Sequence, residues 1–367
     1  MRIRFLLLLS GWLLAMLPAT SQAPKYSNEF LSIGVGARAL GMSNAFVAVA
    51  NDATSGYWNP AGLTHITSNI QLSLMHTQYF AGIARYDYGS LAFRGAGNHH
   101  FGFSYIRFGV DDIPDTSELV DAEGNINYDR IRSFSASDNA FLVSYARRLP
   151  SNENLRLGLN AKIIRRTAGN FAGAWGFGLD AGLQYHLGPW QFAAVGRDIT
   201  STFNAWNYDL DERMREVFTL TGNEIPENSL EITLPRLILE AARNIRINDD
   251  FGLLASLDMI ITTDGKRNVL IKGDPLSMEP NLGVEFNFRD MVFLRGGIGN
   301  MQQYTGNSGQ RINSVQANMG VGIVIGDMLS IDYALTDVGD TSVALYSNVF
   351  SLRLNIQRRE SQAPQEP

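Results

Sequence analysis

Three glycines near the start of the chain have the spacing closest to a known chemical motif. Gly34, Gly36 and Gly41 stand in the stretch Gly-Val-Gly-Ala-Arg-Ala-Leu-Gly. A dinucleotide site uses the spacing G-x-G-x-x-G between a strand and a helix, so that backbone N–H groups can hold a pyrophosphate. Here the third glycine comes two residues too late, and no strand–helix unit follows. The spacing therefore favours close packing of small residues over cofactor binding.

The residue types of common catalytic and metal sites do not occur in working patterns. The chain has no Cys, which excludes thiol catalysis, cysteine-ligated zinc and disulfide bonds. No G-x-S-x-G sequence supplies a serine nucleophile. Neither the HExxH pattern nor the i, i+4 helical spacing of a zinc site occurs among the five histidines, which are His65, His76, His99, His100 and His186. We therefore expect no enzyme, no catalytic residue, no cofactor and no catalytic metal.

An acidic connection at 110–137 gathers side chains with hard oxygen atoms. Such oxygens can bind Ca²⁺, although the spacing of an EF-hand loop is absent. The residues concerned are Asp111, Asp112, Asp115, Asp121, Glu123, Asn125, Asn127 and Asp129. A solvated loop explains the same composition more simply, and both interpretations stay open.

A second long connection, 199–233, contains a segment with helical periodicity. After Asp209 as the N-cap, four apolar residues fall on one helix face; they are Leu210, Met214, Val217 and Phe218. Such a face can dock a protein partner or pack on its own loop as a lid. Trp206 and Tyr208, just before it, have the residue types of the aromatic belt at a membrane surface.

Most of the remaining chain alternates apolar and polar residues with the period of two that is typical of β-strands. In the stretch 175–185, Trp175, Phe177 and Leu179 oppose Gly176 and Gly178. This pattern predicts fourteen strands, near 70–76, 84–94, 98–109, 138–148, 154–166, 174–186, 190–198, 234–244, 251–263, 281–289, 291–298, 314–324, 328–336 and 347–357.

Short turns and long links alternate between these strands, as they do in an up-and-down outer-membrane barrel. The alternative is a soluble β-protein with its apolar face inward, since alternation alone does not say which face meets water. Charged residues make up only 18% of the chain, too few for the polar exterior of a large soluble sandwich. The polar faces carry charges of both signs, which suits a narrow lumen: Lys162, Asp180, Asp258, Glu285, Asp332 and Arg353. We predict an all-β fold, a transmembrane antiparallel β-barrel of about fourteen strands.

The two ends of the chain differ from the barrel pattern. Arg2 and Arg4 precede an apolar run of 13 residues and then small residues, which predicts a signal peptide over 1–21 and export to the outer membrane. No later apolar stretch reaches the length of a transmembrane helix. We expect a hatch over 22–68, the barrel over 69–357 and a disordered polar tail over 358–367. Outer-membrane lipid is the expected surrounding, and the net charge of −6 without a basic cluster argues against nucleic acid as a partner.

Residues 28–66 do not alternate and predict a compact, partly helical plug ahead of the barrel. Asn59 followed by Pro60 suits the start of a helical turn, with Asn as N-cap and Pro at the first position. Gly62 can then end the turn and lead into the first strand.

The same segment carries a family resemblance. Its motifs Gly-Val-Gly-Ala-Arg-Ala-Leu-Gly-Met and Tyr-Trp-Asn-Pro-Ala-Gly-Leu resemble the start of PorV/PorQ proteins, outer-membrane proteins related to FadL-type fatty-acid transporters. The resemblance covers about 35 residues and implies a FadL-like fold, a fourteen-stranded barrel with an N-terminal hatch. It places the hatch motif at Gly34, Gly36, Ala37, Arg38, Gly41, Trp58, Asn59, Pro60, Ala61 and Gly62.

Two functions follow from this resemblance. A PorV-type role in type IX protein secretion implies outer loops that bind a translocon barrel or the C-terminal domain of secreted cargo, with a filled lumen. The alternative is a FadL-like transporter of hydrophobic small molecules such as long-chain fatty acids. It predicts an apolar cavity beside residues 36–61 and an interrupted strand close by. The polar lumen-facing residues favour secretion.

Overall fold

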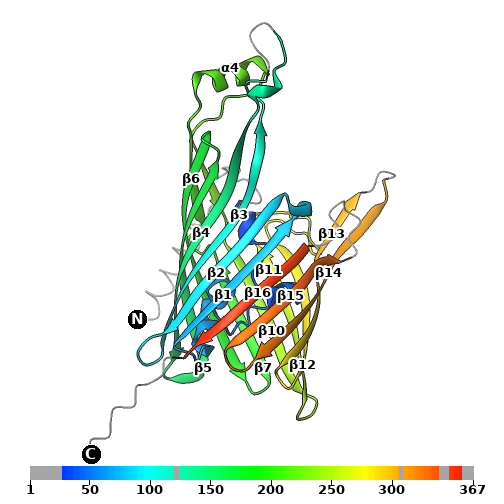
Figure 1. Cartoon of the computed structure of the whole chain (residues 1–367). Helices are drawn as coiled ribbons and strands as arrows, with labels where there is room; N and C mark the ends of the chain where they lie inside the picture. Colours follow the sequence, from blue (N-terminus) through cyan, green and yellow to red (C-terminus); the bar gives the residue numbers. More distant parts are fainter. Residues whose placement is uncertain (1–26, 120–123, 306–308, 339–346, 358–367) are drawn as a thin grey trace, which may run out of the picture.

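The computed structural model describes residues 27–119, 124–305, 309–338 and 347–357. Within these ranges the chain forms a closed antiparallel barrel of fourteen strands (Figure 1). The barrel strands are β1 (Ile70–Tyr79), β2 (Ala84–Arg94), β3 (His99–Asp115), β4 (Arg132–Leu149), β5 (Asn152–Ala168), β6 (Ala172–Leu187), β7 (Trp190–Arg197), β10 (Arg236–Arg246), β11 (Phe251–Thr262), β12 (Ser277–Phe288), β13 (Val292–Thr305), β14 (Arg311–Ile325), β15 (Leu329–Val338) and β16 (Ser347–Ile356). The predicted barrel and its number of strands are confirmed.

The first and last strands close the barrel. Leu72 of β1 lies opposite Leu91 of β2 on one side and Leu354 of β16 on the other. The other barrel strands pair antiparallel in chain order, with β7 joined to β10, so the backbone groups of the closed wall are paired within the sheet, as a membrane requires.

Exposure shows which face of the strands meets lipid. The apolar side chains of Val143, Leu159 and Leu294 are 58, 55 and 54% exposed on the outside. Their neighbours along the strands, Ser144, Asn160 and Arg295, are 0, 3 and 7% exposed and point into the lumen. An apolar outer surface with a polar interior is the arrangement of a membrane barrel, and it excludes the soluble alternative.

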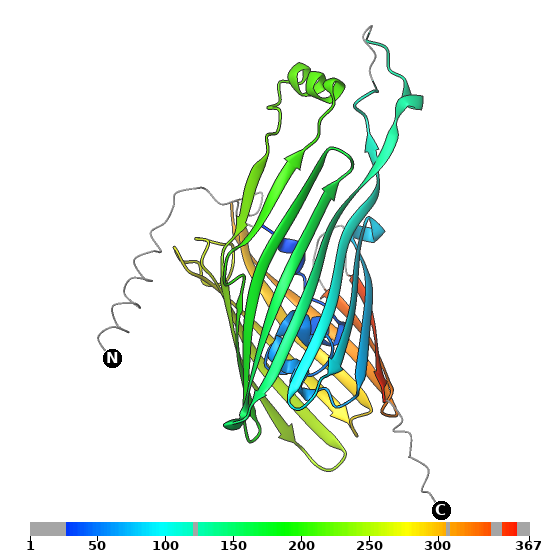
Figure 2. The same cartoon turned by 90° about the vertical axis from the view of Figure 1, so that its left-hand side faces the viewer.

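One side of the wall is much taller than the rest. Strands β3 to β6 rise above the other strands at the end that carries the long links (Figures 1 and 2). Two strands that the sequence pattern missed extend this wing: β8 (Thr202–Tyr208) pairs with β6, and β9 (Ser229–Thr233) pairs with β8. Helix α4 (Glu212–Leu220) lies at the top, between β8 and β9.

Two predicted connections are therefore partly strand. The link 199–233 contains β8 and β9, because the tall β6 offers an edge on which they pair. The link 110–137 is also shorter than expected. Strand β3 continues to Asp115 past a bulge between Val110 and Ile113, and β4 begins at Arg132. The link also contains the short turn η4 (Tyr128–Arg130), and Asp121 and Glu123 lie outside the described residues.

Other expectations concern parts of the chain outside this description. The predicted signal peptide (1–21) and polar tail (358–367) lie outside the described residues, and both stay predictions. In the described ranges, no helix is long and apolar enough to cross a membrane.

The N-terminal segment, residues 27–68, lies inside the barrel (blue in Figure 2). It contains the short turns η1 (Glu29–Leu31), α2 (Ala37–Gly41), α3 (Ser55–Trp58) and η2 (Pro60–His65). Its apolar side chains form most of the buried core, with Val35, Met42, Val47 and Leu63 all 0% exposed. The N-terminal segment thus packs the interior of the barrel. Outside this segment, a further short turn, η3 (Phe80–Gly82), follows β1.

Candidate functional site

Asn59 and Pro60 fix one end of the N-terminal segment against the wall. The Asn59 side chain caps η2 by accepting the Ala61 N–H at 3.2 Å, which confirms the predicted N-cap. Its amide Nδ2 donates to the carbonyl oxygens of Val47 and Leu183, both at 3.0 Å. Asn59 is 0% exposed, so this one side chain joins two parts of the segment to strand β6.

Glycines in the wall make room for this contact. A Cβ on Gly158 of β5 would overlap the backbone of Pro60 and Ala61, and one on Gly182 would overlap the Asn59 amide oxygen. Gly62 does not end the turn as predicted, because η2 continues to His65. A Cβ on Gly62 would instead overlap the Ala50 carbonyl, so close packing explains this glycine.

Helix α2 packs on a second group of wall glycines. Gly41 lies against the backbone of Gly320 in β14, and a Cβ on Gly297 of β13 would overlap the backbone of Met42. The remaining small residues of the motif position α2. Gly36 has a φ of +85° and donates its N–H to Met75 Sδ at 3.0 Å, and Ala37 N–H donates to Ser351 Oγ at 2.8 Å.

Arg38 ties α2 to an ion-pair network across the lumen. Its Nε atom donates to Glu285 Oε2 and its Nη2 atom donates to Glu285 Oε1, both at 2.8 Å. Arg295 also binds Glu285 at 2.6 Å and reaches Asp332 at 2.6 Å. Arg353 pairs with Asp52 of the N-terminal segment at 3.0 Å. Buried charges persist when they are paired in this way, and the predicted crossing of the lumen by charges of both signs is present.

Gly34 and Trp58 belong to the apolar side of the same segment. The Trp58 indole N–H donates to the Val35 carbonyl at 2.9 Å, and the Trp58 ring is close to Gly34. Arg197 of β7 lies over the rings of Tyr57 and Trp58, with its Cζ 4.6 and 5.7 Å from their centroids. All ten residues of the predicted hatch motif are thus brought into one segment inside the barrel; their role as a hatch stays a proposal.

The predicted partner-binding face is elsewhere, at the top of the wing. Helix α4 starts two residues later than expected, with Asp211 rather than Asp209 as N-cap, because Asp211 accepts the Met214 N–H at 2.7 Å. Leu210 is buried, while Met214, Val217 and Phe218 are half-buried. Figure 1 shows that this helix is far from the N-terminal segment, so the two predicted groups form separate sites.

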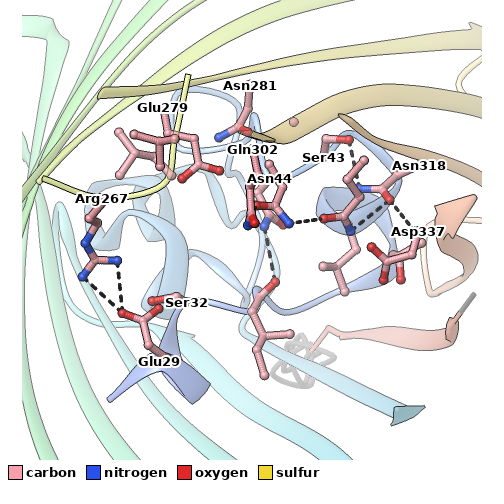
Figure 3. A pocket seen from close by; sticks show the side chains of 18 of the residues that line it. Glu29, Ser32, Ser43, Asn44, Arg267, Glu279, Asn281, Gln302, Asn318 and Asp337 are labelled. Carbon is pink, nitrogen blue, oxygen red and sulfur yellow. Dashed lines mark hydrogen bonds and ion pairs between the residues drawn. The ribbon is translucent and has the colours of Figure 1, made fainter. Parts of the chain in front are cut away.

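A cavity of about 650 Å³ lies above α2, near the end with the long links (Figure 3). Its apolar wall contains Ile33, Leu40, Tyr79, Ile260 and Val269, and amides and charged groups cover the remainder. The polar lining residues include Glu29, Ser32, Ser43, Asn44, Arg236, Arg267, Asn268, Glu279, Asn281, Asn300, Gln302, Gln316, Asn318 and Asp337. This cavity is therefore not the apolar cavity that the transporter alternative predicted, because both apolar and polar side chains line it.

A second cavity, of about 370 Å³, lies on the other side of α2 near the short turns. Arg38, Glu285, Arg295, Asp332 and Arg353 line it. The outer cavity is bounded by Leu40 and Ser43, at the opposite end of the same helix. Helix α2 and its ion pairs therefore stand between two cavities on the β10–β16 side of the lumen.

The wall is interrupted beside the N-terminal segment. Strand β6 pairs with β7 from Ala181 to Leu187, but with β8 from Ala172 to Phe177. Residues 198–201 connect β7 to β8 as a loop, in which Asp198 and Ser201 have positive φ values of 56 and 55°. An interrupted strand, as expected for a FadL-like transporter, is present here. The sequence pattern predicted the end of the strand near residue 198 but not its continuation as β8.

Buried charges hold this interruption in place. Lys162 Nζ lies 2.7 Å from Asp180 and 2.6 Å from Asp198, and the three side chains are at most 7% exposed. The Asp198 N–H donates to Asp180 Oδ1 at 2.8 Å, and the Ile199 N–H donates to the Leu179 carbonyl at 2.9 Å. Lys162 and Asp180 are visible in the sequence as charges on polar strand faces, but only the fold brings Asp198 to them.

A loop at 263–276 borders the outer cavity and contacts the N-terminal segment. Arg267 pairs with Asp264 of its own loop at 2.6 Å and with Glu29 at 3.3 Å. Burial disfavours the charged form of Asp264, but the hydrogen bonds from Arg267 outweigh it and hold the pKa of Asp264 below its ordinary value. The pair therefore favours an ionised carboxylate at the rim of the cavity.

Comparison with known proteins gives the fold. No protein-family model and no curated protein matches this sequence. Among solved structures, the CymD monoaromatic hydrocarbon channel is 13% identical, matches over 89% of this chain and 99% of its own, and has a TM-score of 0.55. A Pseudomonas aeruginosa FadL homologue is 15% identical over 88 and 98%, with a TM-score of 0.50. The P. putida toluene transporter TodX is 11% identical over 89 and 99%, with a TM-score of 0.51.

These likenesses show that the chain has the fold of FadL-type outer-membrane transporters. They do not bear on the resemblance to PorV/PorQ proteins, which stays a prediction from the N-terminal motifs.

Proposed function

We propose that this protein is an outer-membrane transporter of small hydrophobic organic molecules. The observation that carries the proposal is the interruption of the wall at residues 198–201, where β6 exchanges β7 for β8 beside Tyr57 of the N-terminal segment. Neighbours with the same fold include a monoaromatic hydrocarbon channel and a toluene transporter. This favours the transporter alternative over protein secretion.

Such an interruption is costly in a membrane barrel. Backbone groups that leave the sheet ladder must find other partners, because lipid offers none. Here the Asp198 N–H donates to the Asp180 carboxylate, and the N–H groups of Ile199 and Ser201 donate to the carbonyl oxygens of Leu179 and Asp198. A continuous strand would need no such arrangement. The interruption is therefore explained most simply if it has a function. An apolar molecule released here would pass from the lumen into the membrane.

The lumen side of the interruption is filled in this structure. Arg197 donates to the carbonyl oxygens of Leu31 and Tyr57, both at 3.3 Å. Passage of a molecule therefore requires movement of the N-terminal segment away from β7. This makes the segment a hatch in our proposal.

Removing the excess residues of the interruption tests the proposal. Four steps along β6 separate Ala181 from Phe177, whereas seven steps separate their partners Gly196 and Phe203, so three residues are in excess. Deleting residues 199–201 should let β6 pair with one continuous strand. We expect cells that produce this variant to lose protein-dependent uptake of labelled toluene and of a labelled long-chain fatty acid.

A deletion of three residues in an outer loop, 222–224, is the matched control and should leave uptake unchanged. Heat-modifiable migration on gels would show that both variants form the folded barrel. Uptake by a folded 199–201 deletion at the level of the unaltered protein would refute the proposed route.

A second candidate is the binding of a protein partner through the wing. Its support is the height of β3 to β6 with β8, β9 and α4 above the barrel (Figures 1 and 2), together with the PorV/PorQ-like motifs. A translocon barrel or a secreted cargo domain is the partner that the resemblance implies. Deleting 209–228 should then abolish recovery of that partner from membranes while toluene uptake continues.

A further inference from the structure

Two polar side chains that line the outer cavity, Asn281 and Glu279, lack the protein partners that such groups normally have. Asn281 of β12 is 3% exposed, and its amide forms no side-chain hydrogen bond within the described part of the chain. Glu279, two residues earlier on the same face of β12, forms no ion pair there either. Both side chains line the cavity (Figure 3).

The wall is shaped to keep the Asn281 amide in this position. A Cβ on Gly299 of β13 would overlap Asn281 Oδ1, so only glycine leaves space for the amide. Buried polar groups normally have partners, and an unsatisfied one costs free energy. A ligand that donates hydrogen bonds would satisfy the Asn281 amide oxygen and the Glu279 carboxylate.

The cations at the cavity are already occupied by carboxylates of the protein. Arg267 pairs with Asp264 and Glu29, and Arg236 lies 2.6 Å from Ser32 Oγ and 3.7 Å from Asp198. An anionic ligand would meet the Glu279 carboxylate without gaining a new cation. The charge arrangement therefore disfavours carboxylate ligands and favours neutral or cationic donors.

We propose that Glu279 and Asn281 bind the hydroxyl or amino end of the transported molecule, whose apolar body lies on Ile33, Leu40 and Ile260. This deepens the proposed function and rests on it: the substrate is an amphipathic molecule with a hydrogen-bond donor. Plain hydrocarbons and fatty-acid anions, which lack such a donor or carry the wrong charge, should be weaker ligands of the same protein. The volume of about 650 Å³ is within the usual range of small-molecule sites.

Four probes with the same aromatic ring and different substituents test the assignment: toluene, benzyl alcohol, benzylamine and benzoate. Their binding to the purified full-length barrel in detergent is measured by calorimetry. Since hydrogen bonds to a charged group contribute more than neutral ones, we expect benzylamine and benzyl alcohol to bind about tenfold more tightly than toluene or benzoate.

Two variants separate the contributions of the polar groups. Glu279→Gln should remove the preference for benzylamine, and Asn281→Leu should lower the affinity for benzyl alcohol. Glu224→Gln, the same change in an exposed outer loop, is the matched control and should bind all four probes as the unaltered protein does. Equal or stronger binding of toluene or benzoate than of the two donors would overturn the assignment.

Uptake of the same probes by cells separates failure of this inference from failure of the transport proposal. Protein-dependent uptake that is strongest for toluene would refute the role of Glu279 and Asn281 but retain transport. Tight binding of the donors without protein-dependent uptake of any probe would refute transport but retain the binding site.

Discussion

At the scale of single residues, the Asn59 side chain fixes the N-terminal segment against the barrel wall. One buried amide caps η2, holds the Val47 carbonyl and reaches Leu183 in the wall. Apolar packing alone would leave these three backbone groups without partners. The side chain thus converts a local turn preference into a fixed position inside the barrel.

Asn59→Ala should weaken the docking of the segment by about 1–3 kcal/mol, because it leaves buried carbonyl groups unsatisfied. Hydrogen exchange of residues 45–66 in the folded barrel measures this loss. Asn154→Ala, at an exposed position, should leave exchange unchanged. Equal protection in the Asn59 variant and the unaltered protein would show that Asn59 does not hold the segment.

Arg38 connects the residue scale to helix α2. It binds Glu285 through two hydrogen bonds at the edge of the second cavity, within the barrier that α2 forms between the two cavities. Arg38→Ala should shorten that barrier and raise the conductance of the barrel in planar bilayers severalfold. Arg85→Ala, an exposed rim arginine with a side chain 55% exposed, is the control. Unchanged conductance of the folded Arg38 variant would place the barrier elsewhere.

At the scale of elements, the loop at 263–276 is held to the N-terminal segment by charge. The folded-state pKa of Asp264 is lowered, so its pairing with Arg267 stabilises the loop fully above the ordinary carboxyl pKa of about 4. That contribution is lost as pH falls through the lower folded-state pKa.

We therefore expect the loop to loosen in acid, below about pH 4, and to recover at neutral pH. Hydrogen exchange of residues 264–277, corrected for the intrinsic effect of pH, measures the change. Asp264→Asn should show weak protection at every pH. An unaltered protein whose loop protection does not change down to about pH 2 would contradict the argument.

At the scale of the whole molecule, the orientation of the strand faces decides stability. Leu159 lies midway along β5 and is 55% exposed on the outside. Leu159→Arg should destabilise the barrel by about 2–4 kcal/mol, the usual cost of an arginine near the bilayer midplane. Ile247→Arg, in the turn after β10 and equally 55% exposed, should cost about 0–1 kcal/mol.

Denaturant unfolding from lipid vesicles measures both variants. Equal costs at the two positions would mean that the outer surface of β5 is not in the hydrocarbon. In detergent micelles the difference should shrink, because micelles adapt around a charge.

The sequence by itself determined the fourteen barrel strands and their apolar and polar faces. Alternation with a period of two is a local property of each strand, so 84–94 or 251–263 could be located without knowing their neighbours. The Asn59–Pro60 turn was equally readable, because capping involves residues that are adjacent in the chain.

Only the tertiary structure decided what the lumen and the wall interruption are made of. Three features join residues that are distant in sequence: the exchange of β7 for β8 along β6, the ion pair between Lys162 and Asp198, and the cavity at Glu279 and Asn281. The strands β8 and β9 were missed for the same reason, since they exist because β6 is tall enough to pair with them. Such contacts depend on which distant strands meet and on how the N-terminal segment packs against wall glycines, and the pattern within one strand specifies neither.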